Sequence, residues 1–296
     1  MKRLVSFGQV KWNYPLSNLT SFKIGGQAKA VVWVNHEVCL KRLLFYLKEN
    51  GYSYYILGQG TNVLVKDHGY PGIIIKLGPS FARLEILLKE KNAIYLKAGG
   101  SIKLSKLLMA SLRCGWGGLE YLVGVPGTLG GAIASNAGAF EHNIEENIID
   151  IKAITQKGEI RWYPKNVLRF GCRTANLPLG TLILEAHLRL VPSAYKKIKT
   201  KMHFYFQQKQ SKQPLNLPSA GCVFKNPKEA AAGKLIEDAG LKGYQIGNAK
   251  ISEKHANFIV NLGGAKATDV LALMELAQNK VFQKTGIFLE PEIKII

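Results

Sequence analysis

The apolar residues in the first two-thirds of the chain repeat alternately at helical and at strand spacing. Apolar residues three or four apart predict helices over 37–50 and 101–114. For the second helix we expect Ser101 as the N-cap and Gly115 as the stop. Short apolar runs predict buried strands over 52–57, 73–75, 93–98 and 181–191, and a hairpin over 148–163 that turns at Lys157 and Gly158.

The pattern changes after Pro192. A basic stretch over 195–210 is predicted to be helical, and a polar stretch with prolines follows over 211–218. We therefore place a domain boundary near 192–200. Beyond it the pattern predicts helices over 231–239 and from a cap at Thr268, and strands over 258–261 and 287–296, the last at a sheet edge because Pro291 cannot donate a hydrogen bond.

Composition narrows the class of protein. The chain has 296 residues, of which 47% are hydrophobic and 20% charged, so it can bury a core and is not disordered. No apolar run is long enough to cross a bilayer, and no secretory leader follows Met1. We expect a soluble protein of two domains.

The charge balance leaves several interpretations open. With 40 Lys and Arg against 20 Asp and Glu, the net charge is +20. Such an excess is typical of nucleic-acid binders, of membrane-surface proteins and of enzymes for polyanionic small molecules. The basic residues are mostly Lys and are scattered, which favours solvated faces over a nucleic-acid platform.

Cysteine and histidine spacing argues against a metal centre. The four cysteines, Cys39, Cys114, Cys172 and Cys222, lie far apart, with no pair at the spacing of a zinc ribbon. The six histidines do not cluster as metal ligands do, and His255 is interpreted as structural. No metal is predicted, and a reducing cytoplasm fits this cysteine usage.

Three glycine-rich stretches are the first candidates for ligand binding. The run Gly-Gln-Gly-Thr-Asn over 58–62 follows an apolar strand, although it is not a G-x-G-x-x-G fingerprint. A longer cluster covers 124–139, and Gly25-Gly26 forms a third. Taken singly, the first stretch is equally explained by an ordinary turn, and close packing of two chain segments is the less favoured explanation of the second. Together they favour a large phosphorylated cofactor, since small residues let backbone amides approach phosphates.

The C-terminal third contains a second candidate, the run Pro-Ser-Ala-Gly-Cys-Val-Phe-Lys-Asn-Pro over 218–227. A lone cysteine is most often an inert small hydrophobic residue. Cys222, however, lies between turn-forming residues and a Lys-Asn pair, which favours exposure. Arg173 and Glu292 are equally compatible with ordinary surface charges when each is considered alone.

Considered as an ordered set, these stretches resemble the UDP-N-acetylenolpyruvoylglucosamine reductase family. The matching segments span almost the whole chain, at 20–26, 57–67, 118–140, 170–174, 218–227, 232–243, 252–261 and 289–292. The resemblance implies an α+β fold. It implies a two-part FAD-binding region of the vanillyl-alcohol-oxidase type over 1–195, divided near 72–78, and a substrate-binding domain over 196–296. The compact Pro-Ser-Ala-Gly form resembles the branch that lacks an extra substrate-capping loop.

The resemblance also implies an activity in bacterial cell-wall synthesis. NADPH would reduce non-covalently bound FAD, and hydride would pass to the enolpyruvyl ether of UDP-N-acetylglucosamine enolpyruvate, giving UDP-N-acetylmuramate. By resemblance, Arg173 stabilises the negative charge that develops on the carboxylate, and Glu292 assists. Cys222 stands where the family has a proton-donating Ser. A thiol is the stronger acid, but neighbouring cations favour the thiolate, which cannot donate.

Binding residues are implied in the same way. For the flavin they are Gly58, Gly60, Thr61, Asn62, Gly124, Pro126, Gly127, Gly130, Gly131, Asn136, Gly138 and Ala139. Lys225 and Asn226 are expected to bind the substrate, since an ammonium and an amide suit a diphosphate and a sugar or uracil edge. A second departure is Cys172, where the family usually has Tyr. We expect a cytoplasmic monomer that binds neither nucleic acid nor membrane.

Two alternatives remain at this stage. One is another flavin oxidase of the same fold, acting on an alcohol or hydroxy acid; the Cys222 run and the ending Leu-Glu-Pro-Glu over 289–292 argue against it. The other is a basic nucleic-acid-binding protein. A yellow, flavin-containing preparation would exclude the second alternative, and NADPH oxidation that depends on the enolpyruvyl nucleotide would exclude the first.

Overall fold

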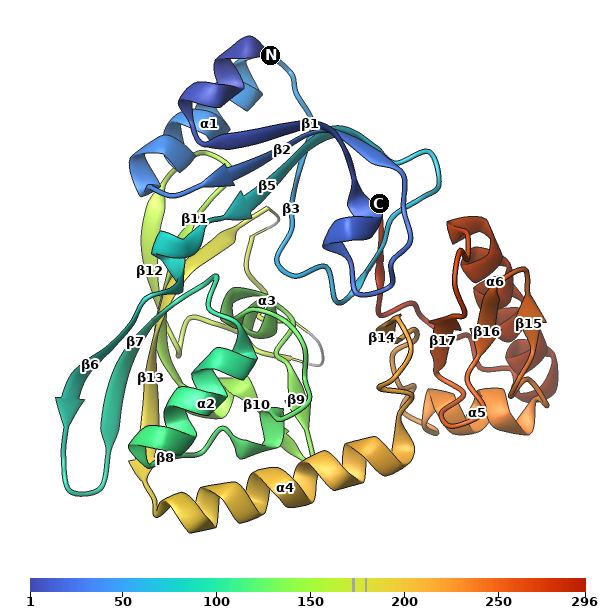
Figure 1. The fold of residues 1–296 in the computed structure, drawn as a ribbon. Helices are drawn as coiled ribbons and strands as arrows, with labels where there is room; N and C mark the ends of the chain where they lie inside the picture. Colours follow the sequence, from blue (N-terminus) through green and yellow to red (C-terminus); the bar gives the residue numbers. More distant parts are fainter. Residues whose placement is uncertain (172–173, 179) are drawn as a thin grey trace. The chain divides into compact units, whose positions relative to one another are not determined.

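The structure is a computed structural model that describes residues 1–171, 174–178 and 180–296 (Figure 1). The chain forms two compact units, each assembled from separate segments. The first consists of Met1–Trp12, Ala30–Gly58 and Gly72–Gln207, and the second of Asn13–Lys29, Gln59–Pro71 and Gln208–Ile296. The predicted boundary near residue 195 and the predicted division near 72–78 stay predictions.

The first unit contains a four-stranded sheet with an adjoining helix. The strands are in the order β1 (Gln9–Pro15), β2 (Gln27–Val34), β5 (Tyr70–Leu77) and β3 (Tyr54–Ile56), with β3 parallel to β5. Helix α1 (Glu37–Glu49) buries Leu40, Leu43, Leu44 and Leu47 completely in a core that includes Ile73 and Ile75. The spacing of these leucines is what predicted the helix over 37–50, and that prediction is confirmed.

A six-stranded antiparallel sheet forms the rest of the first unit. Its strands are β12 (Ile160–Pro164), β11 (Ile148–Ile154), β13 (Leu182–Pro192), β7 (Ile94–Gly99) and β6 (Leu84–Lys89), with β8 (Trp116–Gly117) paired to β13. The hairpin of β11 and β12 confirms the one predicted over 148–163. The helices associated with this sheet are α2 (Leu104–Cys114) and α3 (Leu129–Ala134). Strands β9 (Gly138–Ala139) and β10 (His142–Asn143) form a separate two-stranded ribbon.

The ends of elements were predicted less well than their centres. Helix α2 begins at Leu104 with Lys103 as its N-cap, so Ser101 is not the cap that we expected. The Ser101 hydroxyl instead donates to the carbonyl of Gly78, at 3.0 Å. This partner lies 23 residues away, and a helical pattern contains no information about it.

Helix α4 (Tyr195–Lys212) confirms the basic helix predicted over 195–210, and its residues are divided between the two units.

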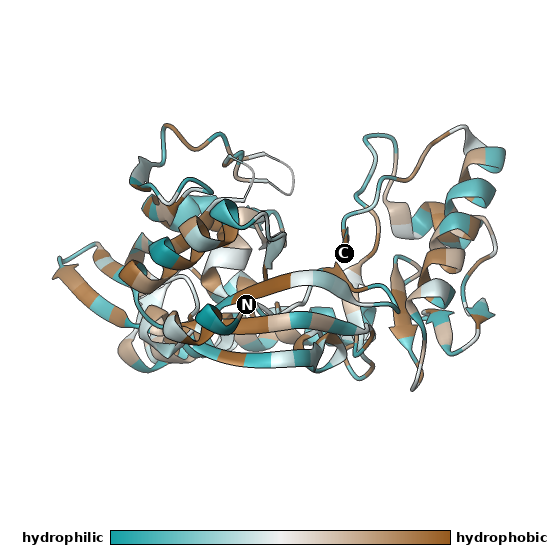
Figure 2. Cartoon of the chain, turned by 90° about the horizontal axis from the view of Figure 1, so that it is seen from above, coloured by the Kyte–Doolittle hydropathy of each residue, from teal (hydrophilic) through white to brown (hydrophobic). Residues whose placement is uncertain are grey.

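Among the described residues, none of the helices combines the length and the apolar character that crossing a membrane requires. The hairpin of β6 and β7 lies at the left in Figure 1, and Figure 2 colours part of it brown, for hydrophobic residues. Its exposed apolar residues include Ile86, Leu87 and Leu88.

The second unit packs one helix against a four-stranded antiparallel sheet and a second helix against the first. The sheet order is β14 (Ser219–Cys222), β17 (Phe258–Asn261), β16 (Ala249–Ile251) and β15 (Gln245–Ile246), and the helices are α5 (Ala232–Asp238) and α6 (Ala267–Thr285). Phe22, Ile24 and Leu64 are buried in the same core as Val270 and Leu273. Two N-terminal segments are therefore integral to this unit, which the linear pattern did not predict.

Thr268 is not the N-cap of α6, contrary to our expectation. The cap is Lys266, and the first turn is completed by Asp67, whose carboxylate accepts hydrogen bonds from the amides of Ala267 at 2.7 Å and Thr268 at 3.0 Å. Burial raises the pKa of Asp67, but the hydrogen bonds from these two residues and the charge of Lys266 outweigh it and leave the pKa lowered.

The end of the chain also differs from its prediction. Only β18 (Lys294–Ile295) is a strand within the predicted 287–296, and it pairs in parallel with β4 (Val63–Leu64). Pro291 forms an isolated bridge with Phe224 instead of continuing that strand. Because a proline has no amide hydrogen to donate, the strand does not continue through this residue.

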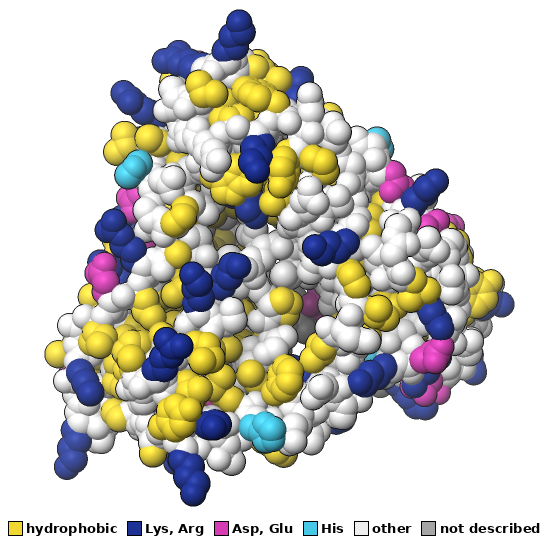
Figure 3. Space-filling view, in the orientation of Figure 1, with side chains coloured by type: hydrophobic (Ala, Val, Ile, Leu, Met, Phe, Trp, Pro, Cys, Tyr) yellow, Lys and Arg dark blue, Asp and Glu magenta, His cyan; other side chains and the backbone are white. Residues whose placement is uncertain are grey.

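Basic side chains are dispersed over the face shown in Figure 3, with few acidic ones among them. This distribution agrees with the interpretation of most Lys residues as solvated surface residues.

We predict that Asp67→Ala destabilises the protein by about 1 kcal/mol at pH 7, because the first turn of α6 loses its side-chain acceptor. The folded-state pKa of Asp67 is lowered, so this contribution is present above the unfolded pKa and disappears as the pH falls through the folded one. Urea unfolding at pH 7 and in acid measures both effects. Glu275→Gln, an exposed change on the same helix, is the control, and equal midpoints for the two variants at pH 7 would contradict the prediction.

Candidate functional site

The first glycine loop begins at Gly58, an exposed residue that is separated from the end of β3 by Leu57. A Cβ atom at Gly58 would lie 3.0 Å from the hydroxyl oxygen of Thr128, so Gly58 approaches the second glycine stretch closely. Within the described chain, the amide nitrogens of Gly58, Gln59 and Gly60 have no protein acceptor. Consecutive unpaired backbone amides are the arrangement that binds phosphate groups in proteins.

The second glycine stretch is held to the start of α2 by main-chain hydrogen bonds. The amide of Leu104 donates to Gly127 at 3.0 Å, and that of Leu129 donates to Ile102 at 2.9 Å. Thr128 caps α3, its hydroxyl accepting from the amide of Gly131 at 3.3 Å. Gly124, Pro126 and Gly131 are exposed, whereas Gly130 packs closely against Gly100. Close chain packing thus accounts for Gly130, and the predicted contact of Gly124, Pro126 and Gly131 with a flavin stays a prediction.

The residues that follow α3 already have protein partners. Asn136 is buried, and its side-chain amide donates to Glu145 at 3.1 Å and to the carbonyl of Gly171 at 3.2 Å. A Cβ on Gly138 would collide with the side chain of Asn143 in the opposite strand, and Ala139 pairs with His142. Asn136, Gly138 and Ala139 therefore shape this loop, and their predicted contact with a flavin stays a prediction.

In the second unit, Glu292 is joined to the segment that carries Cys222. The amide of Glu292 donates to the carbonyl of Val223 at 2.7 Å, and the Glu292 carbonyl accepts from the side chain of Asn62 at 3.2 Å. The amide of Lys294 donates in turn to the Asn62 carbonyl at 3.0 Å. Of the predicted site residues, Asn62 and Glu292 are thus linked directly, and Cys222 is one residue from the link; Thr61 directly precedes Asn62.

Cys222 follows a bulge in β14. The register between β14 and β17 shifts between Ser219 and Cys222, and Gly221 adopts a φ of +80° in the left-handed region. Glycine is favoured in this conformation because it has no Cβ. Cys222 then lies opposite Phe258 and is half-buried. The Ser-Ala-Gly-Cys run is therefore explained locally: Gly221 permits the bulge that precedes the candidate proton donor.

Asn257 fixes this segment, and sequence analysis did not single it out. Its side-chain oxygen accepts from the amide of Phe224 at 2.9 Å and its nitrogen donates to the carbonyl of the same residue at 2.8 Å. The Asn257 carbonyl accepts from the amide of Val223 at 2.8 Å. His255, interpreted from the sequence as structural, accepts from the Asn257 amide through Nδ1 at 3.2 Å. The Asn257 side chain is only 2% exposed.

Lys225 and Asn226, the expected substrate ligands, each have an internal partner. The ammonium of Lys225 forms an ion pair with Glu290 at 3.0 Å, with both side chains substantially exposed. The side-chain oxygen of Asn226 accepts from the amide of Ala232, which begins α5. Arg173, the expected catalytic cation, and Cys172 beside it lie outside the described residues.

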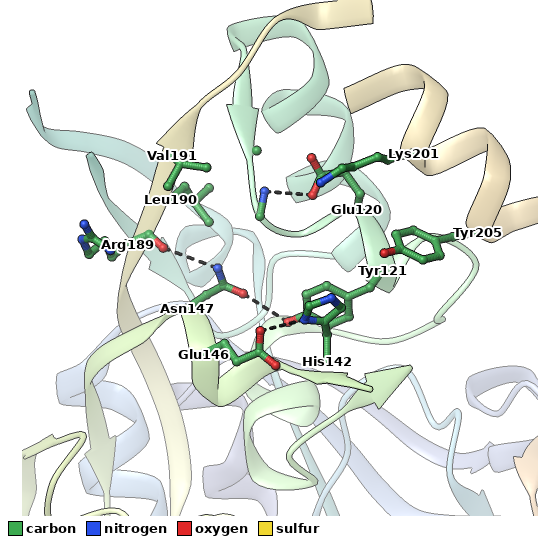
Figure 4. Close-up of a pocket in the computed structure, with 12 residues that line it drawn as sticks. Glu120, Tyr121, His142, Glu146, Asn147, Arg189, Leu190, Val191, Lys201 and Tyr205 are labelled. Carbon is green, nitrogen blue, oxygen red and sulfur yellow. Dashed lines mark hydrogen bonds and ion pairs between the residues drawn. The ribbon is translucent and has the colours of Figure 1, made fainter. Parts of the chain in front are cut away.

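A pocket of about 230 Å³ in the first unit involves none of the predicted site residues (Figure 4). Figure 4 shows Tyr121, whose hydroxyl donates to Asn147, and the pair of His142 with Glu146. Burial, and then the charges of Glu146, Glu120 and Glu145, raise the pKa of Tyr121, so its phenol stays protonated. Cofactor pockets typically measure roughly 300–1,000 Å³, so this pocket is too small for a dinucleotide. Among the described residues no His, Cys, Asp and Glu group is suited to a metal.

Sequence comparison matches both parts of the chain to known families. Residues 28–163 match the FAD binding domain, and residues 213–296 match the UDP-N-acetylenolpyruvoylglucosamine reductase, C-terminal domain. The UDP-N-acetylenolpyruvoylglucosamine reductase of Syntrophobacter fumaroxidans is 42% identical over 97% of this chain and 84% of its own length. That of Caldanaerobacter subterraneus is 39% identical over 100% of this chain and 96% of its own. The chain belongs to the UDP-N-acetylenolpyruvoylglucosamine reductase family.

A solved structure agrees with this membership. The crystal structure of UDP-N-acetylenolpyruvylglucosamine reductase from Thermus caldophilus superposes with a TM-score of 0.81 at 32% identity, covering 97% of this chain and 98% of that one. The predicted α+β fold with a C-terminal domain is confirmed, and so is the family that the ordered segments resembled. The protein is an FAD-dependent oxidoreductase, which removes the nucleic-acid-binding alternative as its main role.

We predict that Asn257→Ala destabilises the reductase by about 2–4 kcal/mol, because two buried main-chain groups of Phe224 lose their partner. Asn279→Ala, at an exposed position on α6, is the matched control and should change stability by less than about 0.5 kcal/mol. Urea unfolding of the two variants measures the difference. Equal stabilities would show that Asn257 does not hold the Cys222 segment.

Proposed function

We propose that this protein reduces the enolpyruvyl ether of UDP-N-acetylglucosamine enolpyruvate to UDP-N-acetylmuramate, with NADPH as the electron donor, in the bacterial cytoplasm. The observation that carries the proposal is the linkage, within one unit, of the Cys222 segment to Glu292 and of Glu292 to Asn62. These are residues that the family resemblance assigns to proton transfer, to charge stabilisation and to flavin binding.

The loops suit the cofactor chemically. Bound FAD supplies hydride transfer between the nicotinamide and the enolpyruvyl double bond. The unpaired amides of Gly58, Gln59 and Gly60 are donors of the kind that a diphosphate requires. Because Gly58 is exposed and has no side chain, a diphosphate can come close to these amides. We assign the diphosphate to Gly58 and to the stretch 124–131, which belong to the same unit.

Proton transfer is assigned to Cys222. Hydride addition to the vinyl carbon leaves negative charge on the carbon that bears the ether oxygen and on its carboxylate. The Cys222 thiol donates the proton that completes the saturated lactyl ether, and the two added hydrogens balance the two electrons from NADPH. Arg173 provides the fixed positive charge for the carboxylate in this proposal, and Glu292 provides a further hydrogen bond.

The structure supports a fixed position for Glu292 in this role. Both of its main-chain groups are bonded, one to Val223 and one to Asn62, so the backbone from which its side chain extends is constrained on two sides. The donor segment is constrained by the same bond at Val223. Pre-positioned groups lower the barrier because no rearrangement is needed in the transition state.

We predict that Cys222→Ala slows the reoxidation of reduced flavin by the enolpyruvyl nucleotide by about 10²–10⁴-fold, the usual contribution of a general acid. Cys222→Ser should retain a rate within about tenfold of the wild type, because a hydroxyl can also donate. Stopped-flow absorbance of the flavin measures both rates.

Cys114→Ala is the control, since Cys114 is an exposed cysteine without a disulfide in α2. A wild-type rate in Cys222→Ala would exclude the thiol as the donor. Loss of the reaction in Cys114→Ala would instead indicate a general sensitivity to cysteine replacement.

Lys225 is expected to contribute to substrate binding and not to the chemical step. Lys225→Met should raise the KM for the nucleotide sugar by about tenfold with kcat little changed, as for a lost charge-assisted contact. Glu290→Gln removes the ion-pair partner and leaves the ammonium in place, so it should not raise KM. If both variants raise KM equally, Lys225 acts only through Glu290. Steady-state kinetics with varied nucleotide sugar distinguishes the two results.

A further inference from the structure

A lysine lies beneath the first glycine loop. Lys76, half-buried on β5, donates through its ammonium to the carbonyl of Leu57 at 3.4 Å and to the carbonyl of Gly58. All three residues belong to the first unit. A lysine ammonium that binds two successive carbonyls fixes the orientation of both peptide planes.

The geometry of a trans peptide then decides where the neighbouring amides point. The carbonyl of Leu57 shares a peptide plane with the amide of Gly58, and the carbonyl of Gly58 shares one with the amide of Gln59. In a trans peptide the C=O and N–H point in opposite directions, and the described chain has no cis peptide. With both carbonyls directed to Lys76, the amides of Gly58 and Gln59 point away from it. These are two of the amides that have no protein acceptor.

No acidic side chain of the described residues forms an ion pair with Lys76. Among the ion pairs of the described residues, none involves Lys76 or Lys103, which is the N-cap of α2 and bridges to Thr128. Burial, and then the positive charge of Lys103, lower the pKa of Lys76 to about 8. An anion bound nearby would favour the charged form of this ammonium.

We propose that Lys76 is the positioning residue of the diphosphate site: it holds the carbonyls of Leu57 and Gly58 so that the amides of Gly58 and Gln59 face the diphosphate of FAD. Lys76 acts through the loop and does not touch the ligand. The inference rests on the proposed function, because it takes the diphosphate to lie at Gly58. A diphosphate is also present in the nucleotide sugar, so the experiment has to separate the two.

The test is FAD binding to the apoprotein, followed by flavin fluorescence across pH. We expect Lys76→Met to raise the Kd for FAD about 10- to 100-fold at pH 7, as for loss of charge-assisted hydrogen bonds. Lys106→Met, an exposed change on α2, is the matched control and should leave the Kd unchanged. With FAD saturating, the KM of Lys76→Met for the nucleotide sugar should equal that of the wild type.

The pH profile separates positioning from a general contribution to folding. Wild-type affinity should fall as the pH rises through about 8, because Lys76 loses its proton there, and Lys76→Met should lack this fall. Lys103 is the charged neighbour that lowers this pKa, so Lys103→Met, a surface change, should move the midpoint to higher pH. If Lys76 had only a structural role, the FAD affinity of Lys76→Met would show the same dependence on pH as that of the wild type.

Either of two outcomes overturns the inference. One is a wild-type Kd and pH profile in Lys76→Met; the other is a raised KM for the nucleotide sugar with an unchanged Kd for FAD. Failure of the proposed function is a different result: a wild-type protein that binds FAD but does not oxidise NADPH in the presence of the enolpyruvyl nucleotide.

Discussion

The hydrogen bonds made by the last residues of the chain hold together the segments of the second unit that carry the predicted site residues Asn62, Cys222 and Glu292. Main-chain groups must find partners, and this segment finds them on two sides. The amides of Lys294 and Ile296 donate to Asn62 and Leu64, while that of Glu292 donates to Val223. A single extended segment therefore connects the first glycine loop to the Cys222 strand. Because a backbone position is set on both sides, Glu292 and Cys222 cannot shift independently.

Asn257 provides a second constraint on the segment that carries Cys222. A buried asparagine that donates to and accepts from one residue, Phe224, stabilises it more specifically than apolar packing does, since an unpaired amide in the core is costly. The bulge at Gly221 requires such support, because it interrupts the strand pairing just before Cys222. The candidate site in the second unit thus consists of short segments held by buried polar contacts. Its loops depend on contacts between distant parts of the sequence.

This dependence explains which features could be predicted from the sequence. The helix at 37–50 and the hairpin at 148–163 were predicted because their periodicity is local, and the family was found because its segments keep their order. The caps were wrong at Ser101 and Thr268 because Gly78 and Asp67, the actual partners, are distant in sequence. Asn257 and Lys76 were missed for the same reason: their side chains act on main-chain groups of other segments. The roles of the predicted site residues stay predictions, and Arg173 lies outside the described chain.

The excess of positive charge takes on a more specific meaning once burial is considered. Ion pairs between exposed side chains, such as Lys234 with Asp238, contribute little to stability because solvent screens them, so most of the surface Lys residues say little about function. Lys76 is different, because burial and a neighbouring cation oppose its charge, and in the described part of the protein its ammonium donates to two carbonyl oxygens and forms no ion pair. A cation retained under these conditions gains most when an anion binds nearby. Cofactor binding and folding stability are therefore linked at this loop, and an anionic cofactor that binds only the folded protein stabilises it according to its concentration relative to Kd.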